Sequence, residues 1–196
     1  MGNTSMKKSL MSVQTITLCA MFVAIGVVLS FIRIPLSTVT EITLTGLPIA
    51  AAAYLFGPGI GFVTGVLIDV CGYIAMPRGA FFPGFTISTG MIGLIYGLLL
   101  YRKWWQGSGR NTGFWQDRKK GLAVRVILAH LIKTAAISLS LNCLWLSIFY
   151  GMDFAVVFLA SLPKELINFP IEVILIYSMI RFLMRVWSVE GIQHHD

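Results

Sequence analysis

The amino-acid sequence predicts an all-α integral membrane protein, a bundle of six transmembrane helices with both the N- and C-termini in the cytoplasm. Hydrophobic residues make up 57% of the chain and charged residues only 12%, roughly half the charged share of a soluble domain. The apolar runs reach the roughly 20 residues that a helix needs to cross a bilayer. Most Lys and Arg residues then fall in segments that face the cytoplasm, which sets the orientation.

The helices are expected within a single transmembrane domain, 1–196, without a soluble domain. They cover 10–32, 42–56, 57–76, 85–101, 122–149 and 163–187. The polar segments are the cytoplasmic tails 1–9 and 188–196 and the cytoplasmic loop 102–121. This loop is basic and contains three tryptophans, which suit the headgroup layer of a membrane.

The first two helices differ in length and in residue pattern. Ala20 and Ala24 lie one turn apart on the first helix and form a flat strip that another helix can approach closely. That strip could serve internal packing or the docking of a partner protein. The second helix is short and has Gly46 and Pro48 near its start, and a Gly-Pro-Gly turn follows it.

The third helix carries a stripe of small residues that ends in an acid. Gly57, Gly61, Gly65 and Asp69 follow one another at four-residue intervals, so they share one face. Glycines allow close backbone contact, and the stripe should therefore carry Asp69 into the bundle. A carboxylate at that depth costs about 2.5–3.5 kcal/mol and needs a partner or a function.

The stretch 77–97, PRGAFFPGFTISTGMIGLIYG, joins a short loop to a glycine-spaced helix. The loop contains Arg78, the aromatic pair Phe81 and Phe82, and a Pro-Gly bend before Phe85. A simple connector does not need so much apolar surface and rigidity. We interpret it as the lid and upper wall of a small-molecule pocket in the outer half of the protein.

Polar side chains gather in the outer half of the last two helices. Pro163 is expected to begin the last helix, as a favourable first-turn residue. Lys164, Asn168 and Glu172 then share one face, and Asn142 lies one turn from Trp145 on the preceding helix. Polar residues inside a membrane indicate a functional site by default. Together with the aromatic residues they suit a small ligand, planar at one end and anionic at the other.

Other interpretations of the polar residues stay open. They could tie helices together, for example through an ion pair of Lys164 with Asp69 or a glutamate. Lys133 is expected to snorkel or to form a structural pair, and His130 to be a packing residue. An intramembrane enzyme could use Asp69 and Glu172 as an acid–base pair, and a self-sufficient proton-coupled carrier would also need buried polar groups.

The sequence lacks the motifs that are typical of several kinds of chemistry. The sequence has no GxxxxGK[ST] phosphate loop and no HExxH motif, so we expect neither ATP hydrolysis nor an enzyme. The cysteines Cys19, Cys71 and Cys143 lie in apolar helices without a CxxC pair or a histidine cluster. We expect free thiols, no metal site and no cofactor.

Two stretches resemble the substrate-binding (S) subunits of energy-coupling-factor (ECF) vitamin transporters. They are FGPGIGFVTGVLIDVCGYIAMPRGAFFPGFTISTGMIGLIYG, residues 56–97, and LNCLWLSIFYG, residues 141–151, and their FFPGFT and LNCLWL segments are most similar to the folate-type branch. The resemblance implies a multi-pass protein of the bacterial cell membrane whose vitamin pocket is closed by outer loops. It also implies, as partners, a coupling membrane subunit docked at Ala20 and Ala24 and two cytoplasmic ATPases that use the ATP.

The resemblance therefore leads us to expect a high-affinity binding subunit for folate or a related pterin, with pantothenate or another vitamin as the alternative. The aromatic residues would sandwich the ring, Asp69 and Asn142 would contact its polar edge, and cations would hold the carboxylate tail. The arginine of the folate branch near the start of the last helix falls on Ser161, and another arginine could replace it. The expected binding residues are Arg33, Asp69, Arg78, Phe81, Phe82, Phe85, Asn142, Trp145, Lys164 and Asn168.

Overall fold

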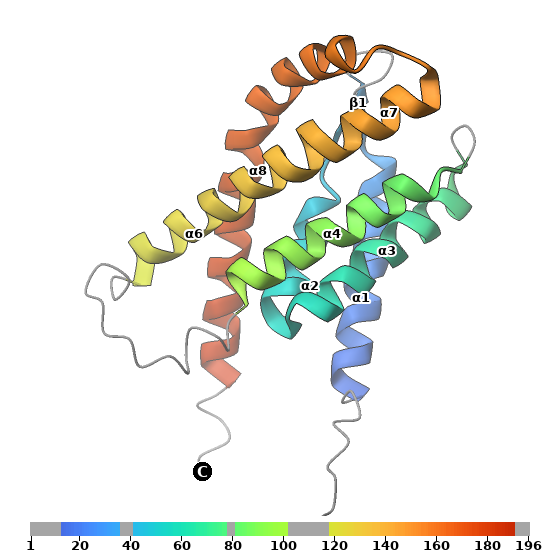
Figure 1. Cartoon of the computed structure of the whole chain (residues 1–196). Coiled ribbons are helices and arrows are strands. Elements are labelled where there is room, and N and C mark those ends of the chain that lie inside the picture. Colours follow the sequence, from blue (N-terminus) through green and yellow to red (C-terminus); the bar gives the residue numbers. More distant parts are fainter. Residues whose placement is uncertain (1–12, 36–40, 78–80, 102–117, 191–196) are drawn as a thin grey trace, which may run out of the picture.

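The computed structural model describes residues 13–35, 41–77, 81–101 and 118–190, and these form a bundle of helices (Figure 1). The elements are α1 (Val13–Phe31), β1 (Arg33–Pro35), β2 (Glu41–Thr43), α2 (Gly46–Phe56), α3 (Pro58–Ala75), α4 (Pro83–Leu100), α6 (Arg118–Lys133), the π-helical segment η1 (Thr134–Leu141), α7 (Asn142–Tyr150) and α8 (Phe154–Glu190). The prediction of a helical architecture is confirmed.

Four helices in the described part of the chain are long and apolar enough to cross a membrane. They are Pro58–Ala75, Pro83–Leu100, Gly121–Tyr150 and Phe154–Arg185. Two further apolar helices, Thr15–Phe31 and Gly46–Phe56, are shorter. The beginning of α1 and the end of α8 lie at the same end of the bundle (Figure 1).

The expected loop between the first two helices contains a pair of short strands. β1 and β2 run antiparallel, with Arg33 opposite Thr43 and Pro35 opposite Glu41. The second helix consequently begins at Gly46 rather than at 42, which corrects the predicted boundary. The physical reason is that the β-branched residues Ile42 and Thr43 favour an extended backbone once a neighbouring strand is available.

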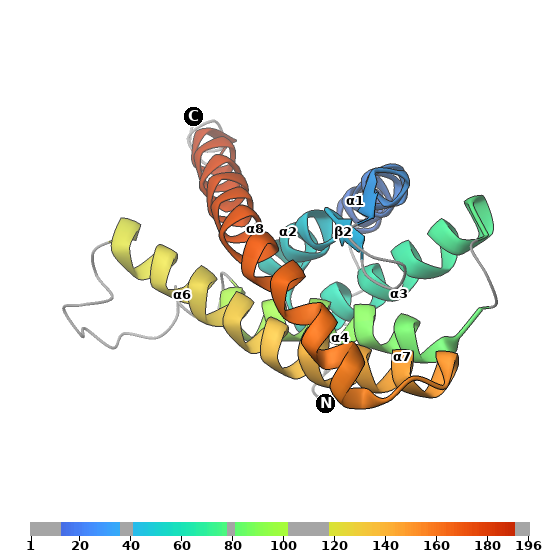
Figure 2. The ribbon, with the colours of Figure 1, turned by 90° about the horizontal axis from the view of Figure 1, so that it is seen from above.

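Helix α2 lies at the centre of the bundle and packs against α1, α3, α4 and α8 (Figure 2). Its segment 49–53 is no more than 1% exposed. Four of those five residues are alanines, so several helices can approach the α2 backbone closely. Tyr96 of α4 and Ile176 of α8 are fully buried in the same core.

Helices α3 and α4 lie side by side with their glycines facing each other. A Cβ atom on Gly61 would lie 2.6 Å from the carbonyl oxygen of Gly93, and one on Gly65 would collide with the carbonyl oxygen of Thr89. The predicted glycine stripe is therefore an α3–α4 contact that leaves no room for a side chain. Asp69, one turn further along this stripe, faces α4 as well.

The last helix begins nine residues before the predicted position, so the boundary at Pro163 is wrong. Gly151 ends α7 with a left-handed backbone, φ 64°, and Asp153 follows. The Asp153 Oδ1 atom accepts a hydrogen bond from the Ala155 N–H (3.2 Å), as in a helix N-cap. Pro163 and Pro170 both lie inside α8, where helix interior packing overrides their usual preference for the first turn.

The predicted fifth helix is continuous but not uniform. α6, η1 and α7 follow one another without a break, and the middle segment Thr134–Leu141 is π-helical. Turns of π-helix are rare in proteins, and those that occur are often found at functional sites. This segment lies beside α8.

Candidate ligand-binding site

An aromatic cluster joins the start of α4 to α7. The Phe82 ring lies 5.6 Å from the Phe85 ring, 5.5 Å from the Trp145 ring and 5.6 Å from the Phe149 ring, measured between centroids. The indole N–H of Trp145 donates a hydrogen bond to Ser88 Oγ (3.1 Å). Three of the four predicted aromatic binding residues thus come together, and their rings offer flat apolar surface for a planar ligand.

The fourth aromatic residue, Phe81, faces elsewhere. Its ring lies 5.1 Å from the ring of Tyr73 on α3, and the residue is 45% exposed. Phe81 and Phe82 are therefore adjacent in sequence but contact different helices. Phe81 contacts α3 and not the rings of the cluster.

Asp69 binds its neighbouring helix on the side away from Trp145. The Thr86 hydroxyl donates a hydrogen bond to Asp69 Oδ2 (2.6 Å). Thr86 and Ser88 are two residues apart on α4 and so point to nearly opposite sides of it. Asp69 consequently lies between α3 and α4, whereas Trp145 lies between α4 and α7.

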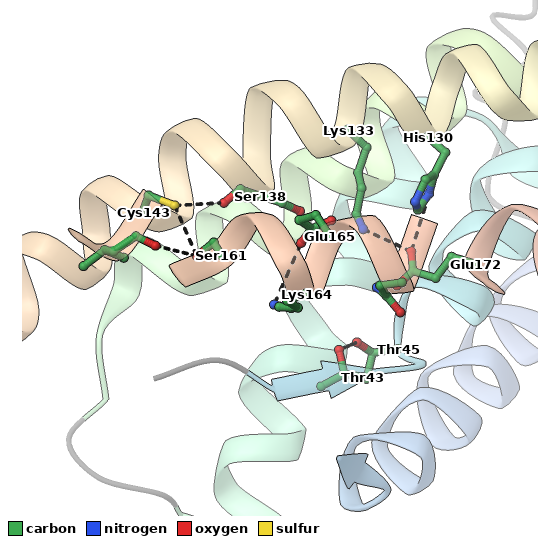
Figure 3. A network of polar contacts seen from close by, with 12 residues as sticks. Thr43, Thr45, His130, Lys133, Ser138, Cys143, Ser161, Lys164, Glu165 and Glu172 are labelled. Carbon is green, nitrogen blue, oxygen red and sulfur yellow. Dashed lines mark hydrogen bonds and ion pairs between the residues drawn. The ribbon is translucent and has the colours of Figure 1, made fainter. Parts of the chain in front are cut away.

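The first half of α8 presents the predicted polar face. The Lys164 side chain is 25% exposed, and its Nζ lies 3.9 Å from Glu165 Oε1, beyond hydrogen-bond distance. It leaves α8 on the side of β2, where Thr43 and Thr45 lie (Figure 3). Asn168, one turn deeper, is buried.

Further inward, this face enters an ionic network between α4, α6 and α8. Glu172 accepts a hydrogen bond from Lys133 Nζ (3.0 Å) (Figure 3) and a second one from Asn168 Nδ2 (2.7 Å). His130 Nδ1 lies 3.0 Å from the Tyr96 hydroxyl and 3.5 Å from Glu172 Oε2. Lys133 thus forms the structural pair that was one of its two expected roles, and His130 packs as expected.

Ser161, where the resemblance led us to expect an arginine, lies in a contact between helices. Ser161 is buried, its hydroxyl donates to the Val157 carbonyl oxygen (2.9 Å), and it accepts a contact from Cys143 Sγ (3.6 Å). Ser161 therefore belongs to the contact between α7 and α8. Cys143 is a free thiol.

The remaining predicted residues are placed as follows. Asn142 begins α7, one turn inward from Trp145, and Arg33 lies on β1. Ala20 and Ala24 are both exposed on α1. Arg78 lies outside the described residues.

Several residues near the site were not among the predicted binding residues. Phe149 and Ser88 contact the aromatic cluster, and Thr86 binds Asp69. Phe149 could have been predicted from the sequence, since it lies one helical turn from Trp145 and so shares its face of the helix. The sequence does not indicate a role for single hydroxyl residues such as Ser88 and Thr86, because many serines and threonines in helices bind only their own backbone.

The acidic, histidine and cysteine side chains of the described residues are spread over several helices. The described part of the chain contains no group of three or more His, Cys, Asp or Glu side chains that could hold an ion. Asp69 and Glu172 also have separate partners, Thr86 and Lys133. The described geometry thus gives no acid–base pair of these two carboxylates.

Apolar membrane-length helices, an aromatic cluster and a polar helix face at one end define a multi-pass membrane protein with a candidate small-molecule site. The family described as "ECF transporter, substrate-specific component" matches residues 14–180. The chain belongs to this family, whose members are transporter components rather than enzymes and lie in the bacterial cell membrane.

Individual relatives share most of the chain. "Folate transporter FolT" of Clostridium novyi (strain NT) is 35% identical over 140 residues, which cover 71% of this chain and 72% of that protein. The protein of the same name from Leuconostoc mesenteroides is 27% identical over 168 residues, 83% of this chain and 82% of that one. A solved structure, "Crystal structure of FolT bound with folic acid", is 33% identical with a TM-score of 0.68 and covers 84% of this chain and 91% of that one.

Proposed function

We propose that this chain is the folate-binding subunit of an ECF importer, with a related pterin as the other possible substrate. The observation that carries the proposal is the likeness to a solved FolT that holds folic acid, at 33% identity over 84% of this chain. The curated relatives named folate transporters support it independently.

The geometry of the site suits the two ends of such a ligand. The pterin ring would stack on the cluster of Phe82, Phe85 and Trp145, and Phe81 is proposed as a further aromatic contact. The anionic tail would bind Lys164, which is partly exposed beside β2, and Arg33 and Arg78 are the proposed additional cations.

Amide groups would contact the polar edge of the ring. Asn142 and Asn168 lie inward of Trp145 and of Lys164, respectively. Asp69 remains in the proposed binding set, but only through a change of partner, because Thr86 already donates to its carboxylate.

The transport cycle would depend on partners, as in the family. The proposal includes a coupling membrane subunit and two cytoplasmic ATPases, six spans with both termini in the cytoplasm, and no cofactor of this chain's own. Ala20 and Ala24 are exposed on α1, as a docking strip requires. Ala24→Leu should abolish folic acid uptake in cells with the partner subunits yet leave binding intact, whereas Ile25→Leu, at an exposed α1 position on another face of the helix, should transport normally.

The direct test is calorimetric titration of the detergent-purified chain with folic acid, and with pantothenate as the control. One-to-one, high-affinity binding of folic acid alone is the expected result. Binding of pantothenate instead would show that the substrate is a different vitamin. Turnover of folic acid by the purified chain would overturn the binding-subunit function altogether.

A further inference from the structure

The aromatic cluster at the start of α4 rests on one face of that helix. Gly84 and Ser88 lie one helical turn apart on this face, and both are buried. A Cβ atom on Gly84 would lie 2.8 Å from Trp145 Cδ2 and would collide with the Phe82 ring. The indole of Trp145 therefore packs directly on the α4 backbone, and it can do so because residue 84 has no side chain.

Ser88 holds the same indole at a second point. Its Oγ atom accepts a hydrogen bond from Trp145 Nε1 at 3.1 Å, and Ser88 is only 1% exposed. Cδ2 and Nε1 are different atoms of one rigid ring, so contacts at both restrict the position and the tilt of the indole. An indole has a single N–H donor and no acceptor. Trp145 therefore presents a ring face to its surroundings, since its donor is already used.

The Ser88 bond joins two helices. Serine hydroxyls inside helices commonly donate to a carbonyl oxygen of their own helix, as Ser178 does to Leu175 at 2.9 Å. The Ser88 hydroxyl accepts a side-chain donor from α7. The Trp145 ring in turn lies 5.5 Å from the Phe82 ring, so an ordered indole also limits how Phe82 can lie.

We propose that Ser88 is a positioning residue for ligand binding. It orients the Trp145 indole before the ligand arrives, so that a flat ring can stack on it without first ordering a mobile side chain, which otherwise costs affinity. The proposal rests on the proposed function and deepens it, because it assigns Trp145 stacking on the planar ring of the ligand and no hydrogen bond to it. The polar edge of that ring is then bound by other side chains.

The first experiment observes the indole without ligand. The chain is labelled with 5-fluorotryptophan, and its fluorine NMR spectrum is recorded in detergent. The sequence has five tryptophans, and the signal that disappears in Trp145→Phe is that of Trp145. Ser88→Ala should shift and broaden this signal and leave the others in place, whereas Ser178→Ala, at an exposed position on α8, should leave all of them. A Trp145 signal that does not move in Ser88→Ala overturns the proposal.

The second experiment is a double-mutant cycle on folic acid affinity, measured by calorimetric titration. Ser88→Ala should weaken binding about three- to tenfold in the wild-type chain, because the ligand must then order the indole itself. The same change in Trp145→Phe should alter the affinity less than about twofold, since phenylalanine has no N–H for Ser88 to accept. Ser178→Ala should bind as wild type does. A Ser88 that acted only through helix packing would give the same loss in both backgrounds.

The outcomes separate this proposal from the proposed function. If wild type does not bind folic acid, the proposed function fails, whereas the fluorine spectrum still shows whether Ser88 orients the indole. If wild type binds folic acid and Ser88→Ala binds it equally well, or loses the same factor in both backgrounds, the positioning role is overturned while the proposed function stands. A thermal melt of each variant shows that affinity differences come from folded protein. Ser88→Cys, which keeps the size of the side chain but is a weak acceptor, replaces Ser88→Ala if the latter melts early.

Discussion

The buried pair of Lys133 and Glu172 should hold the middle of the bundle together. Their side chains are 6% and 5% exposed, and the Nζ and Oε2 atoms are 3.0 Å apart. Lys133→Met removes one charge and leaves the Glu172 carboxylate with Asn168 and a more distant His130. Removing one member of a buried pair costs about 3–5 kcal/mol. For a chain of this size that corresponds to a midpoint roughly 6–20 °C lower.

The assay is thermal unfolding of the purified chain in detergent, followed by near-UV circular dichroism. Arg181→Met is the matched control, because it removes an exposed cation from α8, and its midpoint should stay within about 2 °C of wild type. The double variant Lys133→Met with Glu172→Leu should recover part of the loss, since no unpaired charge remains. A single variant as stable as wild type, or a double variant that loses the sum of both single effects, would refute the ion pair's structural role.

Three further predictions concern the binding site and the helix contacts. Trp145→Ala should weaken folic acid binding at least tenfold, because stacking of an aromatic ring is worth about 1–3 kcal/mol per base or similar ring; unchanged affinity in a calorimetric titration would remove Trp145 from the site. Lys164→Met should weaken folic acid about tenfold or more and leave pteroic acid, which lacks the glutamate tail, unchanged; equal losses for both ligands would mean that Lys164 does not hold the tail. Gly93→Ala should cost about 1–3 kcal/mol of stability by forcing α3 and α4 apart, whereas Gly59→Ala, whose Cβ would meet nothing within 4 Å, should melt like wild type.

The parts of the fold that the sequence predicts well are those set by local pattern. Apolar length indicates helices that cross a membrane, and the glycine spacing indicates the α3–α4 contact, because both follow from residues within one helix. The start of α8 was mispredicted since Pro163 is a good first-turn residue in isolation. Asp153, a better cap directly before an apolar run, starts the helix nine residues earlier, at Phe154. The π-helical segment has no local signal, because it contains neither proline nor glycine.

The sequence predicts which residues gather at the candidate site better than it predicts which side chains bind one another. Trp145 and Phe82 were expected to flank one ligand ring, and in the structure their own rings lie 5.5 Å apart. The same reasoning could not assign partners to the buried acids, because a carboxylate finds its partner through tertiary packing. Within the described residues, Asp69 accepts a hydrogen bond from Thr86 of α4, and Glu172 of α8 accepts one from Lys133 of α6. Only the three-dimensional arrangement shows that these two acids serve different interfaces.

Helix α8 joins the proposed ligand contacts to the ionic network through a single side chain. Asn168 donates to Glu172 on its inner side and presents its unpaired carbonyl oxygen on the other. A ligand N–H that binds this oxygen polarises the amide and strengthens its bond to Glu172, since hydrogen bonds in a chain reinforce one another. Glu172 is held by Lys133 on α6, so ligand binding would tighten the contact between α6 and α8. Folic acid should therefore raise the melting midpoint of wild type more than that of Lys133→Met at equal saturation. The reason is that the variant lacks the Lys133–Glu172 bond through which ligand binding would stabilise the contact of α8 with α6.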